Sequence, residues 1–244
     1  NSVEFPNPKV DAPCVSGDVT PPTVTAPVAS FRAGSQLGFS TAPVRLTWSG
    51  TDPGSGIGHY ELAQSRNGGS FFAIALPSAT ATAITRALAV GSTTYRFRVR
   101  AADTLGNLRA WAYGPTFRVG RVQESSTAIR YGGTWYRRAS TSASGGYYKY
   151  TSAAGASARY TFTGRTVAWI AYRGPTFGSA KVYLDGIYVG TVSLRATTNS
   201  ARRIMFSRTW SSSGTHTLRI VNRATAGHPR INLDAIVVLR ANAP

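Results

Sequence analysis

The chain has 244 residues, 42% of them hydrophobic, which is enough apolar material for one or two packed cores. Its 27 cations and 9 acids give a net charge of +18. A single cysteine, Cys14, excludes an internal disulfide framework and a cysteine-based metal site. No apolar run approaches the ~20 residues of a membrane-spanning helix, so membrane insertion is not expected.

Residue usage favours strands and turns. Glycine (25) and proline (13) are frequent, Thr, Ser and Val are abundant, and Leu, Glu and Lys are scarce. No window keeps an apolar repeat of 3.6 residues over three helical turns. We therefore expect an all-β protein.

The positive charge is uneven and comes almost entirely from arginine. Residues 1–120 carry 10 cations and 6 acids, a net charge of +4, whereas residues 121–244 carry 17 cations and 3 acids, a net charge of +14. Such a charge concentrates polyanions, for example acidic polysaccharide, nucleic acid or an anionic cell surface. The alternative is a compositional bias toward arginine without a binding role.

Residues 1–20 contain three prolines and no apolar alternation, so we expect an extended arm or linker. The chain has no initiator methionine and no signal peptide, and we expect a mature or excised segment. Its composition, rich in Tyr, Thr and small residues, is typical of extracellular proteins. The expected location is therefore extracellular or on a bacterial cell surface.

Residues 21–119 carry strand patterns at the intervals of a β-sandwich. In VRLTW (44–48), alternate residues share one face, and YRFRVRA (95–101) places its apolar residues inward and its three arginines outward. Four further strands are expected at 59–64, 71–76, 82–88 and 115–119.

This first domain resembles a fibronectin type III or related bacterial Ig-like module. The resemblance rests on Asp18-Val19-Thr20-Pro21-Pro22, on Trp48, and on GSTTYRFRVRAADTLGN (91–107), where Tyr95 takes the place of the corner tyrosine. It implies a β-sandwich used as a spacer or adhesion unit, and it implies no particular ligand.

Residues 120–244 form a second predicted domain. Eight strands suit a jelly-roll sandwich better than an Ig fold; they are expected at 147–150, 159–164, 166–173, 180–186, 191–194, 202–208, 215–221 and 231–240. Asp185-Gly186 is a two-residue hairpin signal. The serine-rich WSSSGTH (210–216) is expected to be a loop.

This domain resembles the galactose-binding-like β-sandwich of carbohydrate-binding modules. The resemblance rests on FTGRTVAWIAYRGPTFGSAKVYLDGIYVGTVSL, then SGTHTLRIV, then INLDAIVVL. It implies a C-terminal appendage of a secreted bacterial hydrolase, protease or surface protein.

Catalytic patterns are missing from the sequence. No G-x-S-x-G elbow, HExxH, P-loop or dinucleotide fingerprint occurs, and Asp185 is taken by the hairpin turn. His216 alternates with apolar residues, which predicts a structural histidine, and His228 falls in a loop. We therefore expect no enzyme, and no cofactor apart from the calcium discussed next.

Glu124 and Asp234 lie at the two ends of the second domain. In family 6 and family 35 carbohydrate-binding modules, acids at these places help to hold a structural calcium, which the resemblance extends to this pair. The usual second acid of the first strand is absent, since Gln123 and Ser125 flank Glu124. Pairing of both acids with arginines is the alternative.

Aromatic residues supply the candidate ligand site, because sugar rings pack on Tyr and Trp while arginine and amide groups bind hydroxyls or carboxylates. Strand alternation sends Tyr148 and Tyr147 to opposite sides, so some of the aromatics must be core. The predicted ligand-binding residues are Tyr131, Trp135, Tyr136, Tyr148, Tyr172, Arg173, Phe177 and Trp210.

These patterns predict a non-catalytic, basic adhesion region of a larger secreted or surface protein. Its partner would be a polysaccharide, acidic or not, or an anionic cell-surface polymer. No RRM, KH or helix-turn-helix signature occurs, so no specific nucleic acid is expected. The alternative is a structural subunit of an extracellular filament, sheath or appendage that self-assembles through its sandwiches and N-terminal arm.

Overall fold

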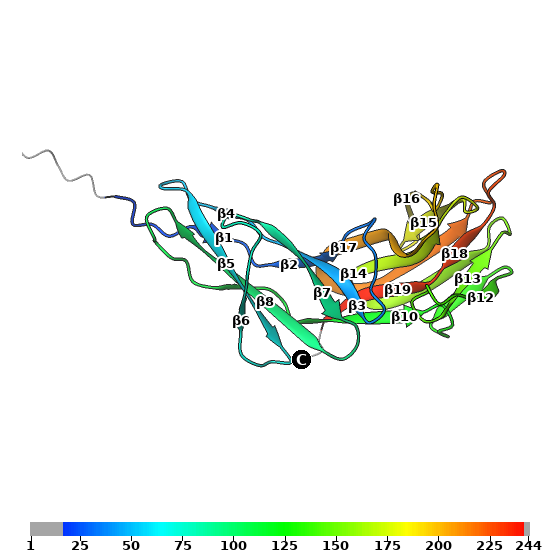
Figure 1. Cartoon of the computed structure of the whole chain (residues 1–244), viewed down its shortest axis with the longest axis horizontal. Coiled ribbons are helices and arrows are strands. Elements are labelled where there is room, and N and C mark those ends of the chain that lie inside the picture. Colours follow the sequence, from blue (N-terminus) through cyan, green and yellow to red (C-terminus); the bar gives the residue numbers. More distant parts are fainter. Residues whose placement is uncertain (1–16, 242–244) are drawn as a thin grey trace, which may run out of the picture.

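The computed structural model describes residues 17–241, and these residues form strands and connecting loops (Figure 1). Over this range there is no helix, and hence no helix that could cross a membrane. The expected all-β class with sandwich architecture is confirmed. Most of the predicted arm (1–20), including Cys14, lies outside the described residues.

The N-terminal sandwich has a three-stranded layer, β2-β3-β7, that faces one half of a much longer sheet. Its strands are β1 (Thr23–Val24), β2 (Val28–Phe31), β3 (Thr41–Thr47), β4 (Gly50–Thr51), β5 (Ile57–Arg66), β6 (Phe72–Ile74), β7 (Ala83–Ala89), β8 (Thr94–Asp103) and β9 (Ala112–Tyr113). The hydroxyl of Tyr95 accepts a hydrogen bond from the N–H of Ala89 at 2.9 Å, which is the contact expected of a corner tyrosine.

The second sandwich places the small sheet β12-β13-β18 against the other half of the long sheet. Its strands are β10 (Phe117–Gln123), β11 (Ile129–Gly132), β12 (Tyr136–Ala139), β13 (Tyr147–Thr151), β14 (Ser157–Arg173), β15 (Ser179–Leu184), β16 (Ile187–Ser193), β17 (Ser200–Asn222), β18 (Ile231–Leu233) and β19 (Ala235–Ala241). Asp185 and Gly186 have φ values of 51° and 87°, as the predicted hairpin turn requires.

Strand β10 belongs to both sandwiches. It pairs with β8 at Phe117 and Arg118, and with β19 along its whole length. The long sheet therefore runs without interruption in the order β16-β15-β17-β14-β19-β10-β8-β5-β6 (Figure 1). The domain boundary predicted at 119/120 falls inside this shared strand.

Residues 166–171 of β14 and 235–239 of β19 are buried on both faces. Ala168 and Ile170 of β14 and Val237 of β19 pack into the core of the N-terminal sandwich. Their neighbours along the strands, Trp169 and Val238, point to the opposite face and pack into the second core. Alternation of side chains along a strand lets one sheet serve two cores. This explains why both segments are continuously apolar in sequence, as strands covered on both faces usually are.

Two strand predictions differ from the structure. The expected loop at 210–216 is part of β17, which pairs residues 214–217 with β14 and absorbs residues 210–213 at a register shift. Threonine pairs on the exposed face, such as Thr161 with Thr217, join their hydroxyls at 2.9 Å. The polar composition that predicted a loop therefore marks an exposed ladder. The expected strand at 231–240 breaks at Asp234 into β18 and β19, which enter different sheets.

We expect the two sandwiches to unfold in a single transition, because they share a strand and a doubly buried sheet. Val237→Ala and Val238→Ala remove the same two methyl groups from opposite faces of β19, and each should lower the free energy of unfolding by about 2–3 kcal/mol. Val189→Ala, at a side chain that is 43% exposed, should lower it by less than about 0.5 kcal/mol. Differential scanning calorimetry of the three variants measures these effects. Two separate unfolding transitions, one shifted by Val237→Ala and the other by Val238→Ala, would contradict the shared core.

Candidate functional site

A hollow of about 300 Å³ opens in the second sandwich, with part of its lining on β12 and β13; Figure 1 shows where these strands lie. The ends of several strands and four loops contribute to it. Its lining consists of Arg138, Ala139, Ser140, Tyr148, Tyr172, Thr176, Phe177, Asn199 and Arg230. The volume is at the lower limit of ordinary small-molecule sites.

Two aromatic rings in contact, tilted by 34°, form one wall of the hollow. The rings of Tyr148 and Tyr172 lie 4.6 Å apart, and the hydroxyl of Tyr172 is 2.6 Å from the hydroxyl of Ser140. Burial raises the pKa of Tyr172, so its phenol stays protonated at neutral pH and can both donate and accept. Tyr150 and the exposed Tyr136 continue the row outward. The ring centroid of Tyr150 lies 6.4 Å from that of Tyr148 and 5.6 Å from that of Tyr136.

The rim of the hollow is polar and cationic. Arg138 and Asn199 are exposed, and the guanidinium of Arg230 lies 4.8 Å from the ring centroid of Tyr150. Among the described residues, no Asp or Glu lines the hollow. Amide and guanidinium donors beside an aromatic wall suit a polyhydroxylated ligand that is neutral or acidic.

The structure brings together only part of the predicted ligand site. Tyr148, Tyr172 and Phe177 line the hollow, but Tyr148 (6% exposed) and Phe177 (5% exposed) are largely core. Arg173 follows Tyr172 along β14 and donates to the carbonyl of Arg195 instead of lining the hollow. Tyr136 reaches the hollow only through Tyr150.

Three other predicted residues lie apart from the hollow. Tyr131 and Trp135 pack on each other at 5.1 Å, and the hydroxyl of Tyr131 donates to the carbonyl of Glu124. Trp210 stacks on the ring of His216 at 3.9 Å. These aromatics are held by packing within the sandwich, which is the alternative that strand alternation left open.

The predicted structural histidine is confirmed. The Nδ1 atom of His216 lies 2.8 Å from a carboxylate oxygen of Asp185, and its ring is half-buried between Trp210 and Phe162. Asp185 also accepts a hydrogen bond from the N–H of Thr217. The pair joins a hairpin turn to the neighbouring strand.

The small-residue loop between β12 and β13 packs against the buried Asp234. The N–H of Ser144 donates to both carboxylate oxygens of Asp234, at 2.9 and 3.2 Å. A Cβ atom at Gly145 would lie 2.8 Å from the side chain of Gln123, so a larger residue would displace this loop. The loop that begins at Ser140, one wall of the hollow, is thus fixed from beneath by Asp234.

Glu124 and Asp234 lie side by side but already have partners. The N–H of Glu124 donates to the carbonyl of Asp234 at 3.2 Å. The Glu124 carboxylate, 1% exposed, receives the Nε–H of Arg137 at 2.9 Å. This is the arginine pairing that the sequence left as an alternative, and for Glu124 it is confirmed. Calcium at this pair stays a prediction.

Burial raises the pKa of Asp234 to about 7 from an ordinary value of 3.8. The negative charge of Glu124 acts in the same direction, whereas the N–H of Ser144 and the cations Arg202 and Arg121 oppose it. The side chain is fully buried, so it acts on the hollow through the loop and not by contact with a ligand.

Sequence reasoning missed the polar half of the hollow, namely Arg138, Ser140, Asn199 and Arg230. Arg138 and Ser140 lie at the end of β12, Asn199 precedes β17 and Arg230 precedes β18, and no spacing in the sequence links these three segments. The one usable signal was the position of Arg230 immediately before a strand of the small sheet.

No family model matches the chain. Among curated proteins, it is 31% identical over 121 residues to the A type blood N-acetyl-alpha-D-galactosamine deacetylase of Flavonifractor plautii, covering 48% of this chain and 16% of that protein. It is 36% identical over 119 residues to the A type blood alpha-D-galactosamine galactosaminidase of the same organism, covering 49% of this chain and 11% of that protein. The chain thus spans less than a fifth of the length of either relative.

Solved structures with some likeness come from carbohydrate-active proteins. A family 35 carbohydrate binding module from Clostridium thermocellum gives a TM-score of 0.34 at 15% identity, covering 48% of this chain and 97% of that one. A family two carbohydrate esterase from Cellvibrio japonicus gives 0.39 at 17% identity, covering 52% and 36%. Likeness at this level defines neither family nor function.

The comparisons correct two expectations. Both curated relatives are named as enzymes that act on galactosamine or its N-acetyl form. The sequence analysis expected a non-catalytic adhesion region, or a filament subunit, and no enzyme; these predictions were wrong. The missing catalytic motifs did not justify an expectation that catalysis is absent.

The raised pKa of Asp234 predicts a pH-dependent stability. Below about pH 4 the carboxyl is protonated in both the folded and the unfolded chain. Between pH 4 and 7 only the unfolded chain ionises, so the free energy of unfolding should fall as pH rises, by an amount on the order of 4 kcal/mol. Asp234→Asn should remove most of this slope.

Urea unfolding at pH 4.5 and 7.5, in buffer containing EDTA, measures the slope. Asp18→Asn is the matched control, because hydrogen bonds from Thr20 and Ser55 lower the pKa of Asp18, which puts its effect below this window. Equal slopes in the wild type and Asp234→Asn would show that Asp234 ionises normally.

Proposed function

We propose that this chain is part of a carbohydrate-processing enzyme and that the hollow beside Tyr172 holds a sugar unit of its glycan substrate. The observation that carries the proposal is the combination of an aromatic wall with amide and guanidinium groups on the rim. Enzyme names on both curated relatives support the carbohydrate-processing role.

The substrate class follows from the charges of the rim. Arg138 and Arg230 line the hollow, and no acid among the described residues does. A free amine such as that of galactosamine would be repelled, whereas an N-acetylated or acidic sugar would not. We therefore assign the hollow to glycans that carry N-acetylgalactosamine or a carboxylated sugar. The net charge of +18 supports acidic polymers as part of this class.

The proposal also includes the type of each domain and the location of the protein. We propose that the first sandwich is fibronectin type III-like and the second galactose-binding-like. We also propose a location outside the cell or on a bacterial surface, where such glycans occur. Self-association through the N-terminal arm remains a prediction, because residues 1–16 lie outside the described part.

The proposal predicts that Arg230→Ala weakens glycan binding at least tenfold. Arg230 presents its guanidinium at the rim, and a charge-assisted hydrogen bond to a ligand contributes about 1.5–3 kcal/mol. Isothermal titration calorimetry with an oligosaccharide ending in α-linked N-acetylgalactosamine measures the effect. Arg159→Ala, which removes the same charge from a residue outside the hollow, should bind like the wild type.

The positive charge of the rim predicts a difference in affinity between two sugars. The affinity for the N-acetylated sugar should exceed that for the free-amine sugar, and raising the salt concentration should reduce the difference. Equal binding of both sugars, or loss of binding in Arg159→Ala to the same extent as in Arg230→Ala, would rule out the hollow as the site.

A further inference from the structure

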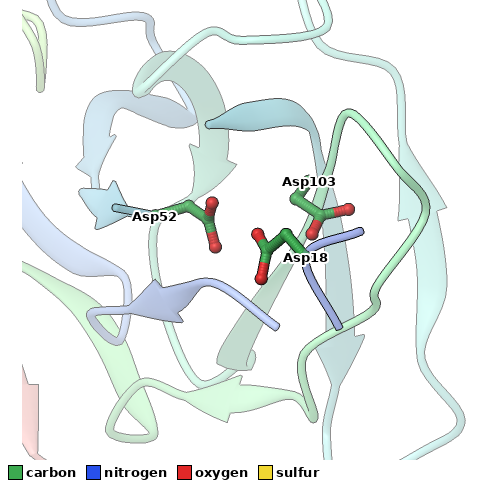
Figure 2. A group of neighbouring side chains, drawn as sticks. All are labelled: Asp18, Asp52 and Asp103. Carbon is green, nitrogen blue, oxygen red and sulfur yellow. The ribbon is translucent and has the colours of Figure 1, made fainter. Parts of the chain in front are cut away.

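Three aspartates from distant parts of the sequence meet at one end of the N-terminal sandwich (Figure 2). Asp18 precedes β1, Asp52 lies in the loop between β4 and β5, and Asp103 is the last residue of β8. One carboxylate oxygen of each lies within 4.8 Å of the others. In the sequence, Asp18 and Asp103 lie in the two segments that resemble an Ig-like spacer module.

Cationic side chains do not balance this cluster. Within residues 17–241, no Lys, Arg or His forms an ion pair with any of the three aspartates. The chain nevertheless has three cations for every acid. The chain is therefore rich in positively charged side chains, yet none of those described neutralises these three aspartates.

A buried carboxylate oxygen points independently to a missing partner. The Oδ1 atom of Asp52 accepts a hydrogen bond from the N–H of Gly56 at 2.8 Å. Its Oδ2 atom is buried and has no hydrogen-bond donor. The carboxylate of Asp52 faces Asp18 and Asp103 (Figure 2). Leaving a buried anionic oxygen without a partner is unfavourable, so a cation between the three groups is the simplest way to satisfy it.

The other two carboxylates are held in place by short hydrogen bonds. The Oδ2 atom of Asp18 accepts from the N–H of Ser55 at 2.9 Å, and the Oδ2 atom of Asp103 accepts from the Nδ2 of Asn107 at 2.6 Å. A Cβ atom at Gly54 would overlap the Asp18 carboxylate, so this loop is shaped around it. The amide donors would keep both side chains oriented before a cation arrives.

We propose that Asp18, Asp52 and Asp103 bind one calcium ion. All three donors are oxygens, and no His or Cys belongs to the cluster, which disfavours zinc and copper. Calcium–oxygen distances of about 2.3–2.6 Å allow ligands of one ion to be up to about 5 Å apart, which fits the observed spread. Magnesium, at about 2.1 Å, would require the oxygens to close in toward a regular octahedron.

The ion would tie the start of the described chain to two loops of the sandwich. Asp18 leads into Pro21-Pro22, and the Nδ2 of Asn107 already bonds the carbonyl of Asp18 at 2.7 Å. Calcium would therefore fix the direction in which the preceding segment joins the N-terminal sandwich. This site is separate from the Glu124–Asp234 pair of the second sandwich.

Calorimetric titration of the EDTA-treated full chain with calcium chloride tests the proposal. We expect one bound ion, a higher Tm with calcium than with EDTA, and a Kd at least tenfold larger in both Asp52→Asn and Asp103→Asn. Asp52→Asn keeps the oxygen that accepts from Gly56, so it should fold. Asp185→Asn, which removes a carboxylate from the second sandwich, should keep the wild-type response.

Three results would overturn the proposal. The first is the absence of binding heat together with an identical Tm in calcium and EDTA. The second is a calcium response that persists in Asp52→Asn and Asp103→Asn but disappears in Asp234→Asn, which would place the ion in the second sandwich. The third is binding of magnesium chloride as tightly as calcium chloride, which would refute the choice of ion.

Discussion

Burial of both faces of residues 166–171 in β14 and 235–239 in β19 is the constraint on which the rest of the structure depends. Ile170 and Val237 belong to one core, and their neighbours Trp169 and Ile236 belong to the other. Both sides of this layer must be filled at the density of a protein interior, so neither core can be repacked without affecting the other. Where the chain leaves the layer, at Asp234, it changes sheets.

The change of sheets places a polar group where apolar packing would otherwise continue. The N–H of Asp234 donates to the carbonyl of Ile170, its carbonyl accepts from Glu124, and its carboxylate holds the loop at Ser144. One residue thus joins both sheets of the second sandwich to the loop beside the hollow. The elevated pKa of its carboxyl is the consequence of placing an acid there.

Strands and their inward faces could be predicted from the sequence because the period-two pattern is local, as in 95–101, where Tyr95, Phe97, Val99 and Ala101 are all buried. The hairpin at Asp185-Gly186 was equally local. The hollow was not predictable, since Ser140, Asn199 and Arg230 meet only through tertiary packing. The serine-rich 210–216 was misassigned because exposed strand ladders and loops share a polar composition.

Because they share strand β10, the two sandwiches are not independent domains joined by a linker. Separating them at residue 120 would cut β10 and leave residues 238–241 of β19 without their partners. It would also expose to water the apolar face that includes Ile170, Ile204 and Leu239. An unpaired edge beside an apolar face is a site of aggregation. Recombination or protein engineering can therefore transfer this pair only as a unit.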